Sequence, residues 1–220
     1  MYLTKELLQE KNACSDGLDW FITNFPKGGE YQEVLNRCAE DDRPSYASWA
    51  LSTFGETDTV IELESITGTH FFFAGSIRVS GSISLSGFLG AGSGIEAGEG
   101  IKAGSGIEAG WGIKAGLGIE AGSGIKAGWG IKAGSGIKAG EGIKAGSGIK
   151  AGWGIEAGEG IESGFGIEAG EGIEAGEDIG IFAGLKIKIV DWNLHAKVIA
   201  KFKPKNLISG YWVENENESN

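Results

Sequence analysis

A six-residue repeat restricts this 220-residue sequence to few folds. Isoleucine recurs every six residues from Ile95 to Ile179, and alanine follows each isoleucine by two residues, with Ser163 the one substitution before Ile181. Further apolar pairs keep the same phase on both sides of this run: Phe71/Phe73, Ile77/Val79, Ile83/Leu85, Leu89/Ala91 and Leu185/Ile187. A hexapeptide period predicts a β-solenoid in which each repeat is one short strand and one corner.

Within each repeat, Ile and Ala point to the same side of a strand, because side chains alternate with period two. The residue between them faces the other side and is always Glu or Lys from Glu96 to Glu174, as a solvated face requires. Almost every Ala is followed by Gly-x-Gly, and we expect these glycines to adopt left-handed conformations at tight corners. The isoleucines and alanines therefore form the predicted core.

The order of the outward charges indicates the size of the coil. Three hexads make a triangular coil of 18 residues and two make a flattened coil of 12, and stacked like charges about 4.8 Å apart repel. In the 18-residue register seven of eleven neighbouring pairs are opposite in sign, against three of twelve in the 12-residue register. The sequence therefore predicts a mainly β protein, a triangular solenoid of six to seven coils over residues 71–190, with a small N-terminal α-helical domain.

The segments on either side of the solenoid lack the repeat. Residues 1–58 have the apolar spacing of a helical module, with Asp16-Gly17 as the break between the first two helices and further helices over residues 30–42 and 45–54. Residues 59–70 are a connector that includes a candidate first strand at 60–63. Residues 191–220 are expected to form a C-terminal cap and an acidic tail, because solenoid ends need protection against edge-to-edge growth.

Charge and cysteine content restrict the class of protein. The net charge of −11 argues against direct nucleic-acid binding, and the charges segregate into a lysine-rich stretch at 121–150 and an acidic stretch at 151–185. Charged residues within the first eleven positions interrupt any apolar signal region, and no later segment is apolar for about 18 residues. We therefore expect a soluble cytoplasmic protein with no membrane partner. Cys14 and Cys38 fall at apolar positions of predicted helices and are expected to be buried free thiols.

The repeat Ala-Gly-x-Gly-Ile-Lys resembles the hexapeptide repeat of left-handed β-helix proteins, best known from acyltransferases, with the large and small positions exchanged. It is also similar to bactofilin-like cytoskeletal proteins, which are right-handed triangular helices, so the two resemblances imply opposite handedness. The segment Ala-Cys-Ser-Asp-Gly-Leu-Asp-Trp-Phe at 13–21, followed by Phe-Pro-Lys-Gly at 25–28, looks like a short helical module of uncharacterised phage and prophage proteins. This last resemblance implies a phage origin and action in the host cytoplasm.

Residue types suited to catalysis are scarce. An acyltransferase of this fold uses a histidine as general base, and this chain has only His70 and His195, which fall near opposite ends of the predicted solenoid. Neither histidine has a metal ligand at a typical spacing, the cysteines are too far apart in sequence to suggest a zinc site, and no phosphate-loop lysine follows the glycines. The sequence predicts no catalytic residue, no metal and no cofactor.

Large apolar side chains at the corners of the coil are the main candidates for function. With two nearby lysines they form the candidate interface: Trp111, Leu117, Trp129, Trp153, Phe165, Lys114 and Lys132. Trp111 and Trp129 fall in neighbouring coils, about 5 Å apart along the axis. Exposed residues of this kind are typical of interface hot spots, whereas the alternative places them under the helical module or the C-terminal segment.

Three functions fit these features. The first is a non-catalytic binding protein that acts on a host protein or protein complex, such as a phage-encoded inhibitor of a defence system like CRISPR. The second is a self-assembling, bactofilin-like scaffold, in which the basic middle of one molecule meets the acidic coils of another to form a homo-oligomer. The third, an acyltransferase, is disfavoured because neither histidine is suitably placed.

Overall fold

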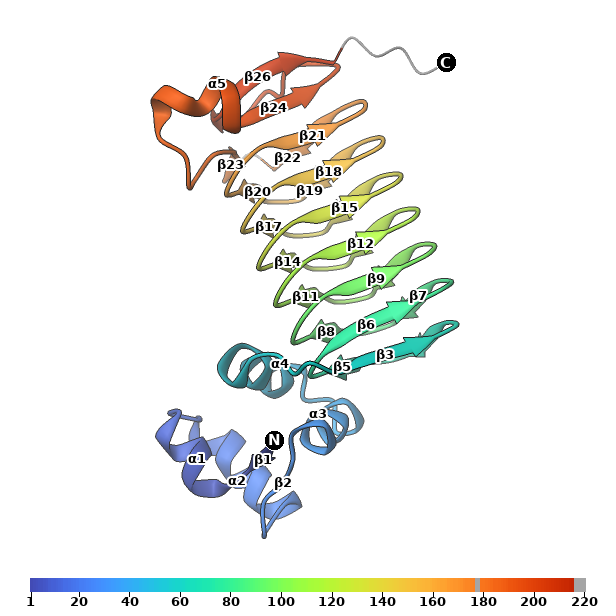
Figure 1. The fold of residues 1–220 in the computed structure, drawn as a ribbon, viewed down its shortest axis with the longest axis vertical. Helices are drawn as coiled ribbons and strands as arrows, with labels where there is room; N and C mark the ends of the chain where they lie inside the picture. The colour runs from blue at the N-terminus through green and yellow to red at the C-terminus, as the bar shows by residue number, and fades with distance from the viewer. Residues whose placement is uncertain (177–178, 216–220) are drawn as a thin grey trace.

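The computed structural model describes residues 1–176 and 179–215. Figure 1 shows a helical module at the N-terminal end, a long stack of short strands, and further strands with a short helix at the C-terminal end. Equivalent residues of successive coils are 18 positions apart: Ile101 pairs with Ile119, and Ile119 pairs with Ile137. The predicted three-sided β-solenoid is therefore confirmed.

The N-terminal module packs four helices around its own apolar core. Its elements are β1 (Tyr2–Leu3), α1 (Lys5–Glu10), α2 (Ser15–Asn24), β2 (Gly29–Glu30), α3 (Tyr31–Glu40) and α4 (Pro44–Phe54). Thr4 caps α1 by accepting a hydrogen bond from the Leu7 N–H at 3.2 Å, and Pro44 occupies the first turn of α4. Across the described ranges, no helix is both long and apolar enough to cross a bilayer.

Two details of this module differ from the sequence prediction. Asp16 and Gly17 lie inside α2, and the break between α1 and α2 falls at Asn12, which has a left-handed φ of 58°. Asparagine tolerates this conformation better than most residues, so the break does not need glycine. Cys38 is buried as expected, whereas Cys14 is exposed because it precedes the first turn of α2; both thiols are free.

Three parallel sheets form the sides of the prism, and successive strands of the chain pass from sheet 1 to sheet 2 to sheet 3. Sheet 1 contains β3 (Val60–Leu63), β6 (Ser76–Val79), β9 (Ile95–Ala97), β12 (Ile113–Ala115), β15 (Ile131–Ala133), β18 (Ile149–Ala151), β21 (Ile167–Ala169), β24 (Lys197–Ala200) and β26 (Tyr211–Glu214). Sheet 2 contains β4 (Ile66–Gly68), β7 (Ile83–Leu85), β10 (Ile101–Ala103), β13 (Ile119–Ala121), β16 (Ile137–Ala139), β19 (Ile155–Ala157) and β22 (Ile173–Ala175). Sheet 3 contains β5 (Phe71–Phe73), β8 (Leu89–Ala91), β11 (Ile107–Ala109), β14 (Ile125–Ala127), β17 (Ile143–Ala145), β20 (Gly160–Ser163), β23 (Gly180–Phe182) and β25 (Leu207–Ser209).

The prism extends beyond the repeat frame at both ends. The predicted connector forms β3 and β4, which pair in parallel with β6 and β7 as the first coil. At the other end, Val198 and Trp212 continue the sheet 1 column above Ile167, so the predicted cap is itself built partly of additional strands. The sheets of nine, seven and eight strands therefore make about eight coils. The acidic tail beyond Asn215 lies outside the described residues.

The interior of the prism is a stack of isoleucine and alanine side chains. Every repeat isoleucine from Ile95 to Ile173 is buried, and Ser163, which replaces an alanine, is buried as well. The Ser163 hydroxyl lies within hydrogen-bond distance of the Ser147 and Gly166 carbonyls and donates its one proton between them, which satisfies its polar group inside the core. Because each buried isoleucine contributes about 1.5–3 kcal/mol, this stack is the main source of stability of the prism.

The repeat glycines have a different role from the one predicted. Between Gly75 and Gly176 no glycine has a positive φ, so the corners do not use left-handed backbone. The first glycine of each corner instead packs against the preceding coil: a Cβ on Gly128 would lie 1.9 Å from the Gly110 carbonyl oxygen. Glycine is required there because the stacked corners approach more closely than a side chain allows.

The repeat frame ends after Ile173. Ile181, and not Ile179, takes the next inward position of sheet 3 opposite Ile161, so this coil is two residues longer than the others. Ile179 is 44% exposed, which corrects the expectation that every repeat isoleucine points inward. β23 pairs Gly180 with Gly160, a separation of 20 residues where the coils of the repeat have 18. This pairing places Ile181 inside the prism and leaves Ile179 two positions before it, outside the strand.

Residues 184–196 then leave the prism as an excursion between sheets 3 and 1, here called the corner loop. It contains η1 (Ile189–Asp191) and α5 (Trp192–His195), and its chain returns to sheet 1 at β24. Leu185 is exposed and Ile187 lies in no strand, so the expected continuation of the repeat through these two residues is wrong.

Side-chain amides close both ends of the prism. Gln32 of α3 donates to the Phe72 carbonyl at 2.8 Å and accepts from the Ala74 N–H at 2.9 Å, which satisfies the outer edge of β5. At the opposite end, Asn206 Nδ2 donates to the Ala175 carbonyl at 2.7 Å, beyond the last strand of sheet 2. Such bonds occupy edge groups that would otherwise pair with another strand.

Candidate interaction surface

Each repeat places one residue at a corner of the prism, between the strands of two neighbouring sheets. The corner between sheets 3 and 1 carries a column that we call the aromatic edge: Ser93, Trp111, Trp129, Ser147 and Phe165. Main-chain hydrogen bonds stack these corners, since the Trp129 N–H donates to the Trp111 carbonyl and the Ser147 N–H donates to the Trp129 carbonyl, both at 2.9 Å. The corner side chains therefore repeat along the axis with the spacing of the strands.

Trp111 and Trp129 form a stacked pair on this edge. Their ring centroids are 5.3 Å apart with an interplanar angle of 11°, which confirms the spacing expected from the register. Trp111 is 47% exposed and Trp129 is 60% exposed, so neither the helical module nor the C-terminal segment covers them. Stacking holds each ring in place before any partner arrives, which reduces the entropy that binding would cost.

The remaining corner candidates are exposed as well, but they do not all share one edge. Phe165 lies on the aromatic edge beyond Ser147, whereas Leu117 and Trp153 lie on the corner between sheets 1 and 2. The third corner, between sheets 2 and 3, is polar in the described residues: Ser105, Ser123, Glu141 and Glu159. Five of the seven candidates therefore gather at one side of the prism: Trp111, Trp129, Phe165, Lys114 and Lys132.

The corner loop enlarges the apolar surface beside the aromatic edge. It leaves the prism at the corner that follows Phe165, and its apolar residues are strongly exposed, Val190 by 82%. The exposed members are Leu185, Ile189, Val190 and Leu194. This loop was not predicted from the sequence, although one signal was present: Gly184 is not followed by the second corner glycine of a normal repeat.

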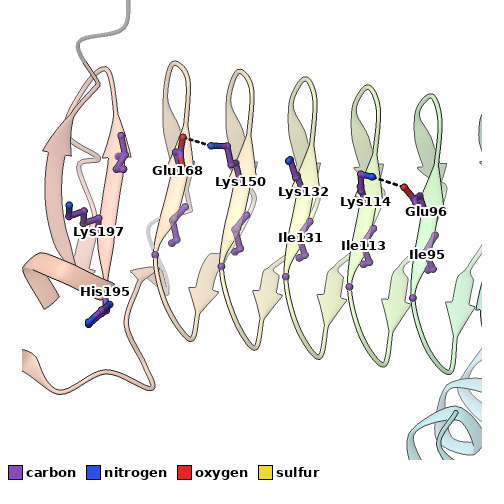
Figure 2. A pocket seen from close by; sticks show the side chains of 18 of the residues that line it. Ile95, Glu96, Ile113, Lys114, Ile131, Lys132, Lys150, Glu168, His195 and Lys197 are labelled. Carbon is purple, nitrogen blue, oxygen red and sulfur yellow. Dashed lines mark hydrogen bonds and ion pairs between the residues drawn. The ribbon is translucent and has the colours of Figure 1, made fainter. Parts of the chain in front are cut away.

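The outer face of sheet 1 contains three lysines in succession with one glutamate on each side. Lys114 Nζ lies 2.6 Å from Glu96 Oε1, and Lys150 Nζ lies 2.6 Å from Glu168 Oε1 (Figure 2). Lys132, between them, makes no ion pair with any residue that the structure describes. The hydrogen bond from Lys114 lowers the pKa of the Glu96 carboxyl, because it stabilises the ionised carboxylate.

Among the described residues of sheets 2 and 3, every outward lysine of the repeats has an acidic partner. The partner lies one coil away in each pair: Lys102–Glu120 at 3.1 Å, Lys138–Glu156 at 2.9 Å, Lys126–Glu108 at 3.8 Å and Lys144–Glu162 at 2.5 Å. Exposed pairs of this type contribute only about 0.2–1 kcal/mol each. Among the outward lysines of the repeats, Lys132 is therefore distinguished by its missing partner and not by its exposure.

A groove with a volume of about 650 Å³ runs along sheet 1 next to the aromatic edge. Its floor is made by the second corner glycines, such as Gly130 and Gly148, and its side by the lysines and glutamates of sheet 1. Leu194 and His195 of α5 and Lys197 of β24 lie at its C-terminal end, where Figure 2 shows His195 near Lys197 at the end of the row of coils. The groove is thus lined by small glycines and by long charged side chains.

The residues considered for catalysis lie apart from the groove or lack a partner group. The His70 Nε2 lies 2.8 Å from Asp42 Oδ1, and its Nδ1 accepts the Phe88 N–H at 2.9 Å, so this histidine joins the helical module to the prism. His195 is exposed on α5. Burial raises the pKa of the Cys38 thiol to about 12, which disfavours its thiolate. In residues 1–176 and 179–215, no three His, Cys, Asp or Glu side chains cluster as a metal site.

Comparison with known families identifies the N-terminal part of the chain. A family model described as the YdhT N-terminal domain matches residues 1–54. The chain thus begins with a domain similar to that family. The match ends with α4, directly before the prism begins, and its description names neither a phage protein nor a hexapeptide-repeat family. Searches of curated proteins and of solved structures found no match.

Proposed function

We propose that this protein is a non-catalytic binding protein that recognises another protein through the aromatic edge. The observation that carries the proposal is the exposed stack of Trp111 on Trp129. Large rings left in water lower the solubility of a monomer and are enriched at the centres of protein interfaces, where they often dominate the binding energy.

The structure around the stack supports a binding role. The rings stand on corners that are fixed by main-chain hydrogen bonds on both sides, so the surface is rigid before it meets a partner. A rigid surface loses little conformational entropy on binding, and the nearby lysines supply a charged rim that speeds encounter. These features favour recognition of a folded or extended protein surface over the turnover of a small substrate.

The double variant Trp111→Ala/Trp129→Ala tests the proposal. Partners captured from a bacterial lysate are identified first, and the affinity of the purified partner is then measured for both proteins. We expect binding to weaken by at least about 1–2 kcal/mol with little change in melting temperature, because the rings leave solvent and not a packed core. Trp153→Ala, an equally exposed corner tryptophan on another edge, is the matched control and should bind as the unmodified protein does.

A large loss of stability with unchanged binding would show that the tryptophans are structural and that the proposal is wrong.

The more specific proposal, a phage-encoded inhibitor of a host defence system such as CRISPR, needs its own assay. Expression in a CRISPR-competent host should then restore plaque formation by a targeted phage, and the double variant should not. Equal protection of the host with and without the protein would contradict that proposal.

Self-assembly into a scaffold is a second candidate, favoured by the charge distribution. The lysines of sheet 1 contrast with Glu156, Glu171 and Glu174 at the C-terminal end of sheet 2 and its corner. If such regions join neighbouring molecules, the particle mass in sedimentation experiments should fall as salt rises from about 0.05 to 0.5 M, because the screening length shrinks well below 10 Å. A particle of constant mass over this range would contradict electrostatic assembly.

A further inference from the structure

We propose that the groove of sheet 1 binds an extended, acidic segment of a partner protein, and that bulky apolar side chains of this segment pack on the aromatic edge and the corner loop. This inference rests on the proposed binding function and specifies the chemistry of the partner. Charge, apolar surface and groove length each support it.

The charges of sheet 1 favour an anionic ligand at Lys132. Lys114, Lys132 and Lys150 are aligned in neighbouring strands, so their attachment points are separated by the strand spacing of about 4.8 Å. The outer two lysines turn away from the centre to reach Glu96 and Glu168, as Figure 2 shows, and the central lysine is left without a counter-ion in the described structure. A partner carboxylate at this point gains a charge-assisted hydrogen bond and reduces the repulsion among three like charges.

The same charges disfavour a second copy of this chain as the occupant. From Glu96 to Glu168 the signs on sheet 1 are negative, positive, positive, positive, negative, and this order is identical in both directions. Two copies related by a two-fold axis through this face would therefore place Lys132 against Lys132 and glutamate against glutamate. Two-fold self-association through sheet 1 is therefore repulsive, which favours a different chain with carboxylates at its centre as the ligand.

The aromatic edge offers a notch for an apolar side chain. Ser147 stands between Trp129 and Phe165, so the two rings are attached two strand spacings apart, about 10 Å, with a small residue between them. The Lys186 side chain approaches this notch, because a Cβ on Gly146 would lie 3.5 Å from its Nζ. An aromatic or long aliphatic side chain of the segment can enter between the rings, where Lys186 adds a positive charge.

The dimensions of the groove indicate a short extended segment. Glu96 and Glu168 are four strand spacings apart, about 19 Å, which an extended chain covers with roughly six residues. Leu194 and His195 border the C-terminal end of the groove, so a bound segment ends or turns there.

Binding of synthetic peptides to the full-length protein tests this inference. The probe is a fluorescent peptide of about eight residues in which Glu alternates with Phe; a second peptide has Lys in place of Glu, and a single-stranded oligonucleotide of similar length is the third probe. We expect anisotropy titrations at low salt to show binding of the acidic peptide, at least about tenfold tighter than binding of the basic peptide or the oligonucleotide. Equal or tighter binding of either of these two would overturn the inference.

Two pairs of variants locate the binding site. Lys132→Glu should weaken the acidic peptide by at least about tenfold, whereas Lys102→Glu, the same charge change on sheet 2, should leave its affinity within about twofold. Trp129→Ala should weaken it to a similar extent, and Trp153→Ala should not. Melting curves confirm that each variant is folded, as expected because Lys132 and both tryptophans are exposed.

The outcomes separate this inference from the function on which it rests. If a captured partner depends on Trp111 and Trp129 but binds Lys132→Glu as tightly as the unmodified protein, the protein is a binding protein and the acidic-segment inference is wrong. If the acidic peptide loses affinity equally in Lys132→Glu and Lys102→Glu, its attraction is unspecific and the inference is also wrong. If no partner depends on the aromatic edge, the proposed function itself fails.

Discussion

The inward columns and the corner columns of the prism come from the same hexads and yet follow opposite rules. The inward position is isoleucine in every repeat from Ile95 to Ile173, and all of these side chains are buried. The corner position between the two glycines changes from coil to coil among serine, glutamate, leucine, phenylalanine and tryptophan. The core tolerates one shape because each coil must match the next, whereas a corner side chain touches mainly solvent.

This difference separates the residues that specify the fold from those available for binding. Ser147 and Trp129 occupy equivalent corners of neighbouring coils. Both donate the same main-chain hydrogen bond to the preceding corner, so the coil does not depend on which side chain is present. The corner side chains can therefore be exchanged while their spacing along the axis stays at about 4.8 Å. Substitutions at inward and outward positions should have very different consequences.

The largest effect is expected from a charge placed in the core. Ile131→Asp at mid-prism removes a buried isoleucine and introduces a carboxylate with no buried counter-ion, so we expect the free energy of unfolding to fall by at least about 4 kcal/mol. Urea unfolding followed by circular dichroism measures this loss, with Ile131→Ala as a milder variant expected to cost about 2–4 kcal/mol. The neighbouring outward substitution Lys132→Asp is the control and should change stability by less than about 1 kcal/mol.

An intermediate effect is expected at the two kinds of corner glycine. A Cβ on Gly128 would lie 1.9 Å from the Gly110 carbonyl oxygen, whereas a Cβ on Gly130 would lie 3.2 Å from the Gly148 carbonyl oxygen. We therefore expect Gly128→Ala to destabilise the prism by about 1–3 kcal/mol through forced displacement of a coil. Gly130→Ala should lower the free energy of unfolding by less than about 1 kcal/mol. A small shift of the Gly148 carbonyl relieves the contact with the new Cβ, and alanine lowers the conformational entropy of the unfolded chain, which offsets part of the loss. Equal losses in the two variants would show that close approach is not why the first glycine is needed.

The sequence was informative where a residue's environment repeats and less so where the repeat ends. The period of Ile and Ala predicted the core, and opposite charges such as those of Glu96 and Lys114 predicted the 18-residue coil, because neighbours in the stack are related by a fixed separation. Ile179 misled the prediction because it keeps the spacing, while the alignment of β23 depends on Gly180 and on pairing with β20. The requirement for glycine was predicted, but its cause was not, because the approach of Gly128 to Gly110 exists only in the assembled stack.

The candidate surface was predicted in part for the same reason. The stack of Trp111 on Trp129 follows directly from the register, so its spacing could be derived. The corner loop has no repeat, and whether Val190 is covered or exposed depends on where the loop leaves the prism. The missing partner of Lys132 could be inferred from the charge order, yet its position in a groove that ends at α5 required the structure.

The smallest effect is expected for an ion pair on the outer face. Lys114 holds the pKa of Glu96 below its ordinary value, so the folded state binds this proton less readily than the unfolded state. The pair therefore stabilises the fold at pH values above the unfolded pKa of about 4.3, and this contribution disappears as pH falls through the lower folded pKa.

Because both side chains are exposed, Glu96→Gln should cost only about 0.2–1 kcal/mol at neutral pH. Urea unfolding of the two proteins at neutral pH and near pH 3 measures the difference, which should shrink on acidification. Glu99→Gln, at an exposed corner where the described residues provide no ion pair, should show no comparable difference at either pH. A Glu96→Gln penalty that persists in acid would mean that the side chain acts through packing, and outward positions would then resemble inward ones more closely than their exposure indicates.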